Sequence, residues 1–82
     1  MTKGEILAEI WSNLEYDFDQ DSENYEFTPL TSVRYKDIES IDKAHLVDDA
    51  TKKVYRMVLE EVPVSDLTAK EKQNALECGI SL

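Results

Sequence analysis

Apolar residues recur at intervals of three and four along the first 18 positions, which predicts an amphipathic helix. The stripe consists of Ile6, Leu7, Ile10, Trp11, Leu14 and Phe18. Ahead of it, Thr2 and Glu5 have the spacing of a capping box, in which each side chain bonds the backbone amide of the other residue. We therefore expect a helix that begins near Lys3 and ends between Leu14 and Phe18.

The following segment, 19–32, has no helical periodicity and contains Pro29, so a loop is expected there. Apolar and polar residues alternate at Tyr25 and Phe27, and again at Val33 and Tyr35. Alternation with a period of two is typical of strands. We expect short extended segments at both places.

Residues 44–62 fit two different structures. The block 54–59 is β-branched and aromatic and follows a polar segment, so 44–47 can pair with 53–59 as a hairpin that places Tyr55, Met57 and Leu59 on one face. Alternatively, a helical stripe runs through Val47 and Val54, supported by ion pairs at i,i+4 worth only about 0.2–0.5 kcal/mol each. The hairpin is the preferred interpretation because the block 54–59 has low helix propensity.

Near the C-terminus, Thr68 and Glu71 form a second capping box, and Gly79 stands where a left-handed residue ends helices. This predicts a helix from about Ala69 to Cys78, with Ala75, Leu76 and Ile80 facing inward. The predicted fold is one small acidic α+β domain over 1–82: N-terminal helix, short antiparallel strands with a hairpin at about 44–59, and C-terminal helix. The helical alternative for 44–62 would give a small all-α bundle.

The charge is large, negative and uneven. The chain has 82 residues and a net charge of −9, of which residues 1–26, with eight acids and one base, carry −7. Such a surface repels nucleic-acid backbones and anionic bilayers, so the expected partner is a basic protein. A chain this short has a thin stability margin, which a shared homodimer interface would improve.

Cysteine content and hydropathy indicate the compartment. Cys78 is the only cysteine and cannot form an internal disulfide, which suits a reducing environment. The longest uninterrupted apolar run is three residues, too short for a secretion signal or a membrane span. We expect a cytoplasmic protein without membrane contact.

A row of carboxylates at nearly every second position is the main candidate for function. Its members are Glu15, Asp17, Asp19, Asp21, Glu23 and Glu26. In an extended chain, alternate residues share a face about 6.6–6.8 Å apart. Duplex DNA carries a charge about every 1.7 Å, so the row mimics a phosphate backbone only with a second row, from a symmetric partner or from Glu5, Glu9, Glu60 and Glu61. The other interpretation is an acidic loop that serves only solvation.

The sequence gives little support for a metal site, a reactive cysteine or a phosphate-binding loop. Calcium-loop frames that start at Asp17 or Glu15 fail at the turn glycine and at another defining position. His45 has no companion ligands, Cys78 lies in no activating motif, and two glycines cannot make a phosphate-binding loop. We expect no catalytic residue, metal or cofactor, and no enzymatic activity.

Tyr16 and Tyr25 flank the carboxylate row, and aromatic rings beside charges are typical of protein-binding hot spots. The leading hypothesis is a non-enzymatic inhibitor or adaptor that blocks a basic surface, such as that of a nucleic-acid-binding protein. In length and composition the chain resembles short acidic inhibitors from viruses and mobile elements, including DNA mimics. The alternative is a structural or assembly subunit whose apolar interface uses Trp11, Phe18, Met57 or Leu59, with the acidic face only solvating.

Overall fold

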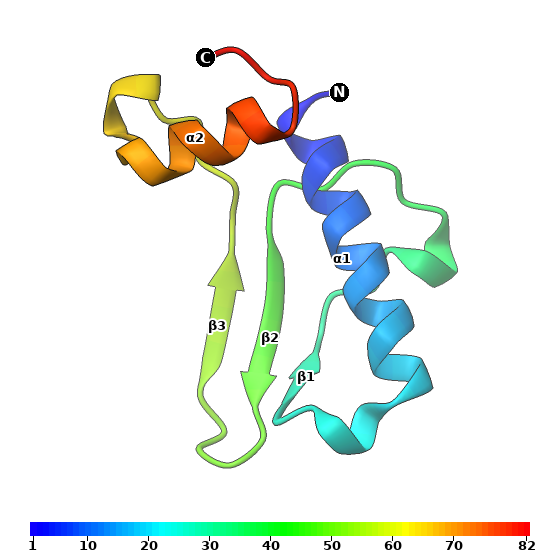
Figure 1. Ribbon diagram of the computed structural model, residues 1–82. Coiled ribbons are helices and arrows are strands. Elements are labelled where there is room, and N and C mark those ends of the chain that lie inside the picture. The colour runs from blue at the N-terminus through cyan, green and yellow to red at the C-terminus, as the bar shows by residue number, and fades with distance from the viewer.

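The computed structural model describes residues 1–82 as an α+β fold, which confirms the predicted class and excludes the all-α alternative (Figure 1). The elements are α1 (Lys3–Gln20), β1 (Phe27–Pro29), β2 (Ala44–Asp48), β3 (Val54–Met57) and α2 (Ala69–Glu77). Short 3-10 turns lie at η1 (Ser22–Asn24), η2 (Arg34–Lys36) and η3 (Val64–Asp66). Neither helix combines the length and apolar character that crossing a bilayer requires.

Helix α1 begins as predicted, because the Thr2 and Glu5 side chains form both hydrogen bonds of the capping box. It continues to Gln20, beyond the expected end. Leu7 and Trp11 are buried on the expected face, whereas Ile6 and Ile10 are exposed. The apolar stripe is therefore wider than the part of the helix that the rest of the chain covers.

The strands form one antiparallel sheet in the order β1-β2-β3. The predicted hairpin is confirmed: Ala44 lies opposite Met57 and Val47 opposite Val54. The Asp48 carboxylate closes the turn by accepting hydrogen bonds from the Ala50 and Thr51 amides. The helical interpretation of 44–62 is wrong because β2 is paired along both of its edges.

The core lies between α1, β2 and the connection from β1 to β2. Trp11, Val33 and Ala44 form its buried centre. The Trp11 indole N–H donates to the Thr31 carbonyl at 2.6 Å, which satisfies its only polar atom. The strand expected at Val33 and Tyr35 is absent, because the chain winds into η2 there.

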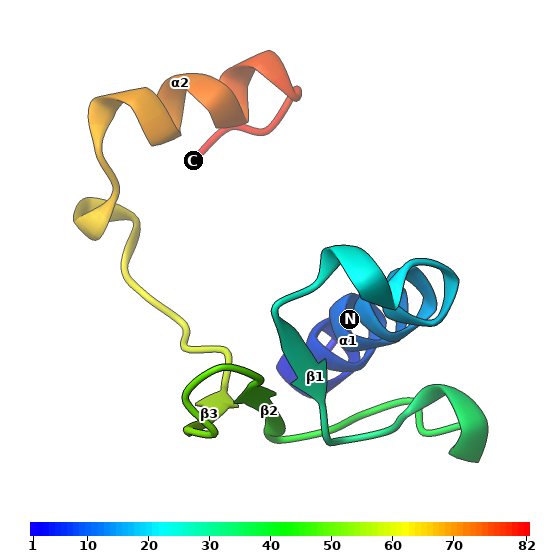
Figure 2. The ribbon, with the colours of Figure 1, turned by 90° about the horizontal axis from the view of Figure 1, so that it is seen from below.

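Helix α2 is also capped as predicted, by Thr68 and Glu71, and Gly79 is left-handed with φ 79°. Its expected inward face is wrong: Leu76 and Ile80 are exposed. In Figure 1 α2 overlaps the start of α1, but the turned view of Figure 2 separates the two helices widely. The helix thus makes no extensive contact with any other helix or strand.

Candidate functional site

The helical conformation of residues 15–20 divides the carboxylate row into two sets. Each residue of a helix turns the side chain by about 100°, so residues two apart point to nearly opposite sides and residues four apart share a side. The extended geometry considered for this part of the row is therefore wrong, because α1 continues to Gln20. Glu15 and Asp19 face the chain, whereas Asp17 lies on the other side of α1 and Asp21, the C-cap, accepts a hydrogen bond from the Asn24 side-chain amide.

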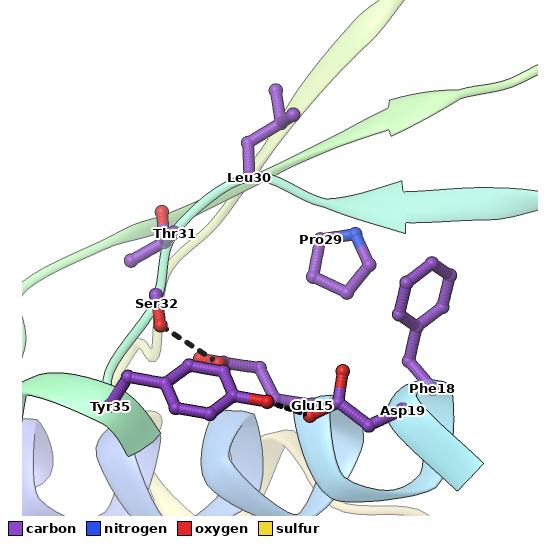
Figure 3. Close-up of a pocket in the computed structure, with 8 residues that line it drawn as sticks. All are labelled: Glu15, Phe18, Asp19, Pro29, Leu30, Thr31, Ser32 and Tyr35. Carbon is purple, nitrogen blue, oxygen red and sulfur yellow. Dashed lines mark hydrogen bonds between the residues drawn. The ribbon is translucent and has the colours of Figure 1, made fainter.

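Glu15 is enclosed by the protein. Its side chain is only 6% exposed and accepts hydrogen bonds from the Val33 amide at 2.7 Å and the Ser32 hydroxyl at 3.1 Å. Figure 3 shows the carboxylate pointing from α1 toward the segment that follows β1. Both oxygens are used inside the molecule, so Glu15 serves the fold.

Asp19 is also paired within the chain. It forms an ion pair with the Arg34 guanidinium at 3.0 Å and accepts a hydrogen bond from the Tyr35 hydroxyl (Figure 3). That hydrogen bond and the Asp19 charge raise the pKa of the Tyr35 phenol above its ordinary value. The guanidinium also lies 4.7 Å from the centre of the Tyr16 ring, a cation–π distance. Tyr16 is thus partly covered by the chain's own arginine.

Glu15, Asp19 and Tyr35 border a hollow of about 300 Å³ on this side of α1. Figure 3 shows Leu30 and Thr31 on the chain across from the helix. The Glu15 oxygens already accept hydrogen bonds from protein donors, and Asp19 is paired with a cation. The arrangement therefore anchors the loop to α1.

The outward set gathers around Tyr25. Asp17 and Asp21 line a shallow hollow of about 420 Å³, together with Tyr16 and Tyr25. The Tyr25 ring packs edge-on against Phe18 and Phe27, at centroid distances of 5.9 and 5.4 Å. This packing fixes the half-buried ring beside the two carboxylates.

A second hollow, of about 490 Å³, lies on the other side of Tyr25 and is lined by Glu26, Asp48 and Asp49. The hairpin turn is held here because the Asp49 amide donates to the Glu26 carbonyl at 3.1 Å and the Thr28 hydroxyl donates to the Asp49 carboxylate at 2.7 Å. Asp48 and Asp49 were missed from the sequence, since they lie more than 20 positions from the row. The hairpin pattern marked them as turn residues, but the side of the molecule that the turn reaches depends on packing.

We name this end of the molecule the acidic end. It comprises the carboxylates Asp17, Asp21, Glu23, Glu26, Asp48 and Asp49 and the rings Tyr16 and Tyr25; the β2–β3 turn also carries the bases Lys52 and Lys53. Glu23 lies on η1, between Asp21 and Asn24 of the first hollow in sequence, and is exposed. Figure 1 shows the end of α1, the start of β1 and the β2–β3 turn together at the bottom of the view.

The backbone adds to the negative field at this end. The C-terminus of a helix carries a partial charge of about −0.5, and carboxylates there are unfavourable for the helix. The last turn of α1 nevertheless contains no basic residue and holds Asp17 and Asp19, with Asp21 as its C-cap. Asp17 and Asp21 also repel each other at i,i+4. Helix stability therefore does not explain this placement.

The second row considered from the sequence does not form beside the first. Glu60 and Glu61 line a hollow with Lys3 and Ile6, near the opposite end of α1. Glu5 is engaged in the N-terminal cap, and Glu9 lines a hollow with Glu5 in the first half of α1.

Elsewhere, His45 accepts a hydrogen bond from the Arg56 side chain at 3.2 Å, and Cys78 is an exposed free thiol. No group of three or more histidine, cysteine, aspartate or glutamate side chains has an arrangement that could hold a metal ion.

Comparison of this chain with known protein families, with curated proteins and with solved structures finds no match.

Proposed function

We propose that this protein is a non-enzymatic, cytoplasmic binding protein that blocks a basic surface of a partner through its acidic end. The observation that carries the proposal is the gathering of five carboxylates, those of Asp17, Asp21, Glu26, Asp48 and Asp49, and a helix C-terminus around the fixed ring of Tyr25, with Glu23 exposed nearby on η1. Lysine and arginine side chains that otherwise hold phosphates would pair with these carboxylates. A nucleic-acid-binding protein is the class of partner that fits this chemistry, as for DNA mimics and inhibitors encoded by viruses.

The roles within the original row now differ. Asp17, Asp21, Glu23 and Glu26 are proposed as partner contacts, with Tyr25 as the aromatic anchor. Glu15 and Asp19 are assigned to holding the fold, because Glu15 is buried and Asp19 is already paired with the Arg34 cation. Tyr16 lies at the border of the acidic end. Arg34 covers one face of its ring, so only the edge of the ring is proposed as a partner contact.

The test compares two baits that differ only in charge. The intact chain and the variant with Asp17→Asn, Asp21→Asn, Glu23→Gln and Glu26→Gln capture proteins from the source cell at low and high salt. The proposal expects basic proteins that the intact chain retains at low salt and releases at high salt, and that the variant does not retain. A control variant, Glu39→Gln with Asp42→Asn, removes two exposed negative charges outside the acidic end and should capture the same proteins as the intact chain.

A second candidate function is an assembly subunit with an apolar interface. It is favoured by the exposed apolar residues of β3 and of the chain beyond it, among them Tyr55, Leu76 and Ile80. Trp11, which the sequence also suggested for such a contact, is fully buried in the core. The two functions use different surfaces, so one protein can have both.

A further inference from the structure

The protein exposes more surface than a compact chain of its size. Only 6 of its 82 residues are buried, and the accessible surface is 6445 Å². A folded monomer of this mass exposes about 5,000 Å², which is roughly 1,400 Å² less. The radius of gyration is 15.4 Å, against about 12 Å for a compact domain of this length. A large part of the protein surface is therefore not buried by any other part of the chain.

One part of this area is a strip between α1 and the sheet edge, which we call the apolar strip: Ile6, Ile10, Tyr55, Met57 and Leu59. Tyr55 and Met57 lie opposite Leu46 and Ala44, so they share the face on which Trp11 packs. Because α1 covers only the β2 part of that face, Tyr55 remains 52% exposed and Met57 37%. Ile6 lines a hollow with Leu59, and Ile10 is one helical turn further along.

The other part is the C-terminal arm, residues 60–82. Every residue in it is exposed except Leu67 and Ala75, which are half-buried. Its helix α2 is only nine residues long, and isolated helices below about 12–15 residues are marginal in water. Both of its ends are nevertheless capped, and the apolar residues Leu76 in the helix and Ile80 just after it are both exposed. Such a helix needs a surface to pack on.

We propose that the arm of one chain packs on the apolar strip of a second copy, and that the second arm packs back on the first chain. In each chain, helix α2 has no surface to pack on and the apolar strip has no helix covering it. In a two-fold symmetric dimer each arm packs on the strip of the other chain, so both arms and both strips are covered. Figure 2 shows the arm leading away from its own sheet. The proposal rests on the second candidate function above and names the subunit's partner as this chain itself.

The arm and the hairpin that carries Tyr55 and Met57 have opposite net charges. The arm contains five acids and two bases, a net charge of −3. The β2–β3 hairpin with the residue before it, 43–57, contains four bases and two acids, a net charge of +2. Opposite charges favour the approach of an arm to the hairpin of another copy. The excess surface of each chain also exceeds the area of about 800 Å² per partner in a standard stable interface.

Sedimentation equilibrium of the intact chain tests the proposal. The expected mass is twice the 9.4 kDa of one chain. Leu76→Glu in the arm and Ile10→Glu in the strip should each weaken dimerisation about 100-fold or more, because each places an unpaired charge in an apolar contact. Leu30→Glu, the same change at an exposed apolar residue outside both parts, should leave the dimer intact. Fluorescence of the buried Trp11 verifies that each variant keeps its core.

Mixing the two defective variants is the decisive experiment. The Ile10→Glu chain has an intact arm and the Leu76→Glu chain has an intact strip, so a one-to-one mixture should form heterodimers through one restored contact. An intact chain that stays monomeric, its arm folded on its own strip or free, overturns the proposal. So does a mixture that stays monomeric while the intact chain dimerises. The variant with a neutralised acidic end should still dimerise, which separates this proposal from the acidic-end function.

Discussion

The buried Glu15 carboxylate accepts a hydrogen bond of 2.7 Å from the Val33 amide, and Val33 itself packs against Trp11 in the core. This contact joins the second half of α1 to the segment between β1 and β2. It also satisfies a backbone donor that would otherwise be buried without a partner. One member of the carboxylate row thus belongs to the structure of the protein.

Replacing Glu15 by alanine should lower the free energy of unfolding by about 1–3 kcal/mol, because the Val33 amide loses its acceptor. Glu15→Gln keeps a carbonyl oxygen at the same place and should cost less. Urea unfolding followed by Trp11 fluorescence measures both. Equal stability of the alanine variant and the intact chain would mean that the contact contributes nothing.

At Gly4, near the start of α1, the backbone lies too close to Ser40 and Ile41 to leave room for a side chain. The Ile41 amide donates to the Gly4 carbonyl at 3.1 Å, and a Cβ at Gly4 would meet the Ser40 side chain and the Ile41 carbonyl oxygen. Gly4→Ala should therefore destabilise by about 1–3 kcal/mol despite the better helix propensity of alanine.

Ser40→Ala, combined with Gly4→Ala, removes one of the two contacts and should recover part of the loss. Thermal unfolding of the four members of this double-mutant cycle measures the coupling. Additive effects would indicate that Ser40 and Gly4 do not meet.

Tyr35 should titrate at a higher pH than an ordinary tyrosine, because its hydrogen bond to Asp19 and the Asp19 charge raise the pKa of the phenol. Since the folded pKa lies above the ordinary value of 10.0, the stabilisation from this bond is fully present below pH 10.0 and is lost as the pH rises through the folded pKa. Absorbance at alkaline pH follows the ionisation. In Asp19→Asn the late component should move toward the ordinary value, and an unchanged titration would contradict the assigned cause.

Neutralising the outward carboxylates should stabilise the protein. Asp17→Asn and Asp21→Asn each remove a negative charge from the C-terminus of α1, so each should raise the free energy of unfolding by about 0.3–1 kcal/mol. Asp19→Asn is the matched control and should not stabilise, because it loses the ion pair with Arg34. A loss of stability in Asp17→Asn would show that this carboxylate supports the fold.

The sequence predicted the elements whose signals are local. Both capping boxes, the left-handed Gly79 and the hairpin turn depend on residues a few positions apart, and the structure forms all of them. The wrong expectations concern packing. Ile6 and Ile10 have the helical spacing of core residues, yet no strand covers their side of α1. Leu76 and Ile80 show the same failure in α2.

The candidate site was predictable only in part. Alternation along the chain indicated that the carboxylates share a face, but the helix continued far enough to turn Glu15 and Asp19 inward. No local sequence signal predicts the inward orientation of these two side chains, because their partners Val33 and Arg34 lie at least 15 positions away. The same long-range packing brought Asp49 beside Glu26.

The most direct test of the acidic end is a titration of a basic protein captured by the intact chain. The quadruple variant Asp17→Asn, Asp21→Asn, Glu23→Gln, Glu26→Gln is measured beside it, at low salt and at about 0.5 M salt, where exposed charges are strongly screened. We predict that the intact chain binds at low salt only, and that the variant fails to bind although it is at least as stable. Equal affinity of the two proteins, or binding that salt does not weaken, would contradict the account.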